Sequence, residues 1–151
     1  MVVLLSAGSS LETPWLKDCK ALVYGCLGGQ AGAGALVDVL TGTVCPGGKL
    51  AETWANAHAD TPAKDNFAGA GRTVQYREGL YVGYRYYETR YYDIIYGQGN
   101  ADSTTGATAS AGNWRYNEEV VYPFGYGLSY TTFSQEIVGE PVITREDHNF
   151  T

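Results

Sequence analysis

A chain of 151 residues with a formal net charge of −6 and a sequence pI near 4.8 is long enough to bury one ordinary hydrophobic core. The acidic balance argues against a nucleic acid partner, because a phosphate backbone is bound by clustered Lys and Arg. No stretch approaches the roughly 20 apolar residues of a membrane helix, so we expect no membrane partner either.

The first apolar run, residues 2–5, is aliphatic throughout and predicts a strand buried on both faces of a parallel sheet. Residues 21–24 repeat the pattern and predict its neighbour. Residues 11–20 contain Pro14 and predict a bent connection or a brief strand between them. No basic region precedes the apolar run at the start of the chain, and this run is shorter than the hydrophobic region of a signal peptide. A cytoplasmic location is therefore expected if Met1 is the natural start.

Residues 30–40 carry the clearest helical pattern, followed by Gly42 where a glycine commonly ends a helix. Residues 49–54 predict a further strand, and residues 55–71 predict a long surface connection. The expected apolar helix face has i, i+3, i+4 and i+7 spacing: Ala33, Leu36, Val37 and Leu40. Strand, turn, helix and strand together indicate an α/β layer architecture.

A glycine cluster at residues 28–34 precedes this helix, so a phosphate cradle at the helix N-terminus is one interpretation. The cluster lacks the Gly-Lys-Ser/Thr of a P-loop. Val37 stands where the third glycine of a dinucleotide fingerprint would fall. Close packing of the helix on the sheet is the favoured interpretation.

The cysteines and histidines indicate no metal site. Cys19, Cys26 and Cys45 are odd in number and form no C-x-x-C pair, so neither a disulfide framework nor a zinc site is predicted. His58 and His148 lie far apart in polar stretches, and we expect both at the surface.

Residues 74–86 alternate in a way that predicts a strand, interrupted at Gly79 and Gly83. Glu78 then shares a face with apolar residues, and a charge there needs a partner. An arginine or several backbone N–H groups would satisfy it, and this structural role is favoured. A role beside a substrate is the alternative, so Glu78 is a candidate substrate-binding residue.

Eight tyrosines lie between Tyr76 and Tyr96. Aromatic faces serve as platforms for sugars, but the same residues fill strand cores and domain interfaces, and interface packing is favoured for most of them. Tyr81 and Trp114 are the further candidates for substrate binding. Residues 97–114 are low in apolar content and dense in Gly, Ala, Ser and Thr, which predicts a loop that is flexible or ordered on contact. Glu118 and Glu119 are expected to form a solvated pair on a strand.

Three blocks, residues 29–50, 76–89 and 122–133, together resemble the closing segment of a family 3 glycoside hydrolase. The resemblance implies a partial three-layer α/β/α sandwich over residues 1–133. Residues 134–151 would then be a linker and the start of a fibronectin type III-like domain.

The resemblance also implies a function, as part of a β-glycosidase that removes terminal β-linked glucose or xylose from oligosaccharides and glycosides. In this family the nucleophilic Asp belongs to a separate barrel domain, and the acid/base Glu commonly lies upstream of the strand that matches residues 1–6. Neither position is present, so no catalytic residue is assigned. The chemistry that the resemblance implies needs no cofactor.

The implied partners are a barrel domain or subunit that carries the catalytic Asp and an oligosaccharide substrate. An apolar edge at residues 2–5 would also favour a homo-oligomer. The alternative functions are a non-catalytic carbohydrate-binding module and a structural docking module.

Overall fold

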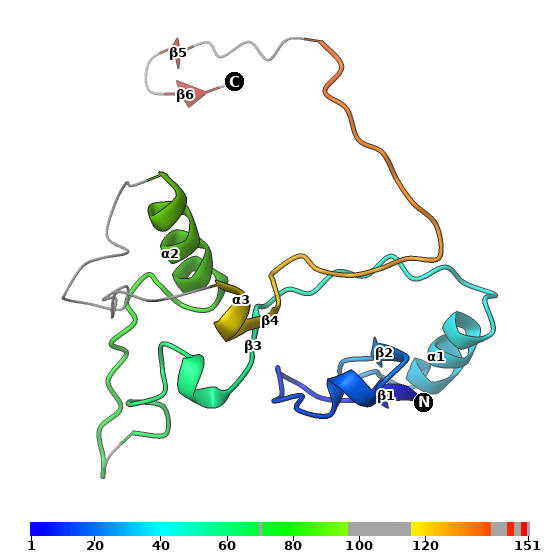
Figure 1. Ribbon diagram of the computed structural model, residues 1–151, viewed down its shortest axis with the longest axis horizontal. Helices are drawn as coiled ribbons and strands as arrows, with labels where there is room; N and C mark the ends of the chain where they lie inside the picture. The colour runs from blue at the N-terminus through cyan, green and yellow to red at the C-terminus, as the bar shows by residue number, and fades with distance from the viewer. Residues whose placement is uncertain (70, 97–115, 140–144, 147–148, 151) are drawn as a thin grey trace.

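The computed structural model describes residues 1–69, 71–96, 116–139, 145–146 and 149–150, without the side chains of residues 92–96 and of the last four. Within these ranges the protein is a small mixed α/β structure with three two-stranded sheets (Figure 1). None of the described helices is both long and apolar enough to cross a bilayer.

The first sheet confirms the two N-terminal strands. Strand β1 (Val2–Leu5) pairs in parallel with β2 (Ala21–Tyr24), with Val2 opposite Ala21 and Leu5 opposite Tyr24. A short 3₁₀ helix, η1 (Leu16–Asp18), lies within the bent connection between them. Burial on both faces of β1 is wrong for the described chain, because Val2 and Leu4 are exposed and alternate with half-buried neighbours.

Helix α1 (Gly32–Leu40) confirms the predicted helix, and Gly42 follows it with a φ of 77°. The expected apolar face is only partly correct. Leu36 is half-buried, but Val37 and Leu40 are exposed. A Cβ added at Gly28 would lie 3.1 Å from the Cα of Gly32, so the glycine cluster permits close packing at the helix start. This contact lies within the cluster itself, so close packing of the helix on the sheet stays a prediction.

Two segments far apart in the sequence, residues 45–50 and 125–130, lie side by side (Figure 1). The Leu50 N–H donates to the Tyr126 carbonyl at 2.8 Å, and the Gly125 N–H donates to the Leu50 carbonyl at 2.7 Å. Lys49 also donates to the Gly127 carbonyl. A Cβ at Gly127 would lie 2.5 Å from the Gly48 carbonyl oxygen, so only glycine fits this approach.

The second sheet forms the centre of the molecule. Strand β3 (Trp54–Ala55) pairs antiparallel with β4 (Val120–Tyr122), which directly follows the short helix α3 (Tyr116–Glu119). The strand expected over residues 49–54 is therefore shorter and begins at Trp54. The Trp54 side chain is 1% exposed and meets the rings of Tyr24 and Tyr122 edge-on, at 5.1 and 6.0 Å between centroids. It thus links the first sheet to the second.

The strand predicted over residues 74–86 is wrong. Residues 77–80 form a turn, and helix α2 (Tyr84–Tyr96) begins directly after Gly83. Gly79 and Gly83 both adopt a φ of 58°, which interrupts an extended backbone. Tyrosines, which favour strands, alternate with other residues in this segment, and that alternation concealed a helix. The buried residues of the helix, Tyr86, Tyr87 and Arg90, follow helical spacing.

A short 3₁₀ helix, η2 (His58–Asp60), lies in the predicted surface connection, and the exposed His58 agrees with expectation. The third sheet is an antiparallel pair, β5 (Arg145–Glu146) and β6 (Asn149–Phe150). The loop of residues 97–114, which includes Trp114, and His148 lie outside the described residues.

Candidate functional site

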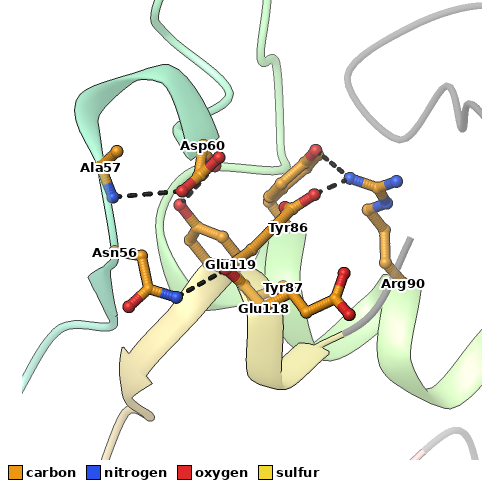
Figure 2. A network of polar contacts seen from close by, with 8 residues as sticks. All are labelled: Asn56, Ala57, Asp60, Tyr86, Tyr87, Arg90, Glu118 and Glu119. Carbon is orange, nitrogen blue, oxygen red and sulfur yellow. Dashed lines mark hydrogen bonds and ion pairs between the residues drawn. The ribbon is translucent and has the colours of Figure 1, made fainter. Parts of the chain in front are cut away.

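A group of buried side chains with polar atoms gathers where α2 packs against β3, β4 and η2. Helical spacing puts Tyr86, Tyr87 and Arg90 on one face of α2, and each of these side chains is buried. Val120 of β4 completes this core. We call the polar groups around it, shown in Figure 2, the α2 network.

Arg90 is the buried charge of the α2 network. Its guanidinium donates to the Tyr86 hydroxyl and lies over the Tyr86 ring, 5.0 Å from the centroid. The Glu119 carboxylate lies 3.8 Å from the same guanidinium nitrogen. A buried cation is tolerated when it is paired and hydrogen-bonded, so Arg90 ties α2 to the start of β4.

Backbone and side-chain hydrogen bonds join η2 to the same network (Figure 2). The Tyr87 hydroxyl donates to the Asp60 carbonyl at 2.9 Å, and the Asp60 carboxylate accepts from the Ala57 N–H at 3.1 Å. The Asn56 N–H donates to the Glu119 carbonyl at 2.7 Å, and the Asn56 amide donates to the Glu118 carbonyl at 2.6 Å. Three segments distant in sequence are therefore fixed together.

Burial raises the pKa of both Tyr86 and Tyr87 above the usual value near 10. For Tyr86 the Arg90 charge opposes this rise without cancelling it. Burial and its hydrogen bond to Glu88 likewise raise the pKa of Tyr116. These phenols stay protonated at neutral pH. Tyr87 and Tyr116 donate hydrogen bonds and Tyr86 accepts one from Arg90, which suits a structural network better than proton transfer.

Three carboxylates in or near the α2 network have a structural contact. Asp60 accepts from the backbone, Glu88 accepts from Tyr116 at 2.5 Å, and Glu119 pairs with Arg90. Among the described residues, no group of three His, Cys, Asp or Glu side chains is arranged to hold a metal ion. The arrangement therefore stabilises the fold, and no described contact prepares a carboxylate for nucleophilic or acid/base work.

The structure brings two of the three predicted substrate-binding residues together. Glu78 and Tyr81 lie in one turn, in which the Tyr81 N–H donates to the Glu78 carbonyl at 3.0 Å. An arginine or backbone N–H groups were expected to satisfy Glu78, and among the described residues its carboxylate accepts from the Asn66 amide at 3.2 Å instead. Tyr81 is half-buried and packs against the core of the α2 network. Trp114 lies outside the described residues.

Sequence reasoning missed the pairing of Arg90 with Glu119. The solvated pair expected at Glu118 and Glu119 is only partly correct. Glu118 is exposed, but Glu119 is half-buried, and both lie on a helical turn instead of a strand. One signal was present: Tyr86 and Arg90 are four residues apart, the spacing that brings side chains together on a helix. The assumed strand hid that signal.

The fold defines the class of protein as a mixed α/β domain. It has a parallel strand pair, a helix that follows a glycine cluster, and an aromatic centre. Residues 1–84 match the Glycosyl hydrolase family 3 C-terminal domain, which is more than half of the chain. The chain therefore belongs to this family.

Curated relatives agree with the family match. The chain is 41% identical to the thermostable beta-glucosidase B of Acetivibrio thermocellus over 133 residues, which is 88% of this chain and 14% of that protein. It is 39% identical to an exo-alpha-(1->6)-L-arabinopyranosidase of Bifidobacterium longum, over 94% of this chain and 15% of that protein. The chain thus spans about one seventh of the length of these relatives.

Solved structures share the fold. A beta-glucosidase from Paenibacillus barengoltzii matches with a TM-score of 0.68 at 30% identity, over 96% of this chain and 13% of that one. A family 3 beta-glucosidase from Bifidobacterium adolescentis matches with a TM-score of 0.62 at 39% identity, over 87% of this chain and 16% of that one.

Proposed function

We propose that this chain is a non-catalytic C-terminal portion of a β-glycosidase that removes terminal β-linked glucose or xylose from oligosaccharides and glycosides. The observation that carries the proposal is the family match over residues 1–84, together with relatives named as glycosidases. In this role the chain forms one wall of the substrate cleft.

The division of labour follows from the chemistry. A retaining glycosidase needs two carboxyl groups roughly 5–5.5 Å apart, one as nucleophile and one as acid/base. Asp60, Glu88 and Glu119 are each engaged in contacts that hold the fold. The catalytic Asp and the acid/base Glu would come from other parts of the enzyme, with the Asp on a barrel domain.

The proposed architecture extends the observed one. The parallel pair β1–β2 with α1 would form part of a three-layer α/β/α sandwich over residues 1–133. Residues 134–151 would lead into a fibronectin type III-like domain. The exposed apolar residues of β1 and α1 support this proposal, because an apolar sheet face and helix face are normally covered by another layer. A homo-oligomer would be the other means of covering them.

The test is a chimera in which the matching segment of the A. thermocellus enzyme is replaced by this chain. We expect the chimera to hydrolyse an aryl β-glucoside with a rate within about tenfold of the parent, a loss of about 1.4 kcal/mol in transition-state stabilisation. Aryl β-xyloside and aryl α-arabinopyranoside in parallel assays would define the preferred sugar. A folded chimera without glycosidase activity would contradict the proposal.

A structural docking module is the second candidate, because many large apolar residues of the described chain are exposed. A stand-alone carbohydrate-binding module is less well supported. Tyr86 and Tyr87 are buried in the core, so their ring faces are not available to a sugar. Titration of the isolated chain with glucose oligomers separates the two, since only the binding module should respond.

A further inference from the structure

One loop of the protein combines a fixed shape with several exposed apolar side chains. We call residues 66–69 and 71–82 the apolar loop. Five of its large apolar side chains are more than half exposed, between 53% and 87%: Phe67, Val74, Tyr76, Leu80 and Val82. Tyr81 differs from them, because it is half-buried against the core. Such a concentration of apolar surface marks an interaction site.

Hydrogen bonds give the apolar loop its shape. The Asn66 side-chain amide donates to the Gln75 carbonyl at 2.6 Å and to the Glu78 carboxylate at 3.2 Å, so a single side chain joins the two arms of the loop. The Phe67 N–H donates to the Ala63 carbonyl at 2.7 Å, within the turn that precedes the loop. A loop held in this way loses little further conformational entropy when it binds a partner.

Close backbone packing fixes the same shape. Gly69 has a φ of +68°, and a Cβ there would lie 2.7 Å from a Val74 methyl group and 2.8 Å from the Thr73 carbonyl oxygen. No other residue fits without displacement of the backbone. The hydrogen bonds described for the Asn66 side chain are thus made within the loop, while the five apolar side chains remain in solvent.

We infer that the apolar loop is the surface through which this chain docks onto the catalytic part of a family 3 glycosidase polypeptide. The inference rests on the proposed function. Three of the five exposed side chains are aliphatic, which suits a protein interface, whereas a sugar platform requires aromatic faces. The exposed Arg72 and Arg77 supply the charged rim that such interfaces carry.

The chain length of the relatives favours the rest of the glycosidase polypeptide, over a second copy of this chain, as the partner of the apolar loop. The apolar loop lies within the segment that matches the family domain, and the relatives carry about six sevenths of their length outside the matched region. That additional polypeptide is available to cover the loop in cis. A docked loop also gives Glu78 a structural role, because its hydrogen bond with Asn66 holds the surface in shape.

The experiment uses the active chimera described above and a triple variant, Phe67→Ser, Tyr76→Ser and Leu80→Ser. The matched control is Phe133→Ser, Ile137→Ser and Val138→Ser, three residues of similar exposure outside the loop. Thermal unfolding of the chimera and of the isolated chain is measured for each variant. Backbone hydrogen exchange of the loop is compared between the unsubstituted chimera and the unsubstituted chain.

We expect the loop variant to lower the unfolding midpoint of the chimera by about 3 °C or more, with the control within about 1 °C of the parent. In the isolated chain neither variant should lower the midpoint, because these side chains are already in solvent. Amides of the loop should exchange about tenfold more slowly in the chimera than in the chain.

Two results would overturn the inference and leave the proposed function standing. The first is an active chimera in which the loop variant behaves like the control and the loop amides exchange as in the isolated chain. The second is an isolated chain that dimerises through the loop, with no effect of the loop variant in the chimera. Loss of activity in a folded, unsubstituted chimera would instead overturn the proposed function.

Discussion

The N-terminal region, residues 1–44, and the aromatic region, residues 54–60, 84–91 and 116–122, are stabilised in different ways. The N-terminal region has regular elements, yet its apolar residues are at most half-buried. The aromatic region contains the first part of helix α2 and short strands, and its residues Trp54, Tyr86, Tyr87 and Val120 are all buried. Regular elements therefore occur in both regions, but among the described residues the packed core lies in the aromatic region.

Substitution of Trp54 by Ala should have the largest effect. Trp54 is almost fully buried and packs on Tyr24 of the N-terminal region and Tyr122 of the aromatic region. Loss of such a side chain costs about 3–5 kcal/mol in the free energy of unfolding. Denaturant titration measures this, and Val37→Ala on the exposed side of α1 is the control, with an expected change below about 0.5 kcal/mol. Equal effects would remove the distinction between the regions.

Substitution of Arg90 by Met should destabilise by about 2–3 kcal/mol, because Glu119 and Tyr86 lose a buried charged partner. A double-mutant cycle with Glu119→Gln isolates the pairwise energy. We expect the double variant to be less destabilised than the sum of the single variants. Additive effects would show that Arg90 stabilises α2 without Glu119.

Alkaline unfolding should report mainly the aromatic region, because burial raises the pKa of four of its tyrosines but of one tyrosine, Tyr24, in the described N-terminal region. Because burial raises the pKa of Tyr86 and Tyr87, the unfolded chain releases their protons first as the pH rises above about 10. Their stabilisation is present in full below that pH and is lost above it. Tyr87→Phe should cost about 1 kcal/mol at pH 7, through the bond to Asp60, and should weaken the alkaline loss. An unchanged pH dependence would contradict the burial of this phenol.

The smallest expected effect concerns the contact between residues 45–50 and 125–130. The Cys45 thiol lies 3.0 Å from the Ser129 hydroxyl, and this hydrogen bond lowers the pKa of Cys45 below its usual value. Ser129→Ala should therefore slow alkylation of Cys45 at pH 7.5, by about two- to threefold. Exposed Cys26 is the internal control and should keep its rate. Equal rates at Cys45 in both proteins would mean that the two segments do not meet in solution.

The strands at residues 2–5 and 21–24 and helix α1 were predictable because their signals are local. Each is a short run or a 3.6-residue period bounded by glycine or polar residues. The family was predictable too, since residues 29–50, 76–89 and 122–133 are distinctive in combination. The pairing of β3 with β4 had no local signal, since Trp54 and Tyr122 are far apart in the sequence.

Helix α2 and the contacts of the α2 network were not predictable from the sequence. Tyrosines have high β propensity, so the run before Tyr86 reads as a strand until Gly83 is known to have a positive φ. The contacts of Glu78 with Asn66 and of Arg90 with Glu119 depend on those turns. Candidate site residues therefore followed the assumed strand, and their surroundings changed when the strand became a turn and a helix.

The most direct test of the account is hydrolysis of an aryl β-glucoside by the isolated 151-residue chain. If the chain is a non-catalytic portion of a glycosidase, as we propose, we expect no turnover above the buffer rate at any chain concentration, because the catalytic carboxylates would lie elsewhere in the enzyme. Turnover that rises in proportion to chain concentration, and is lost in Glu119→Gln or Glu78→Gln, would contradict the central claim and place catalysis within this chain.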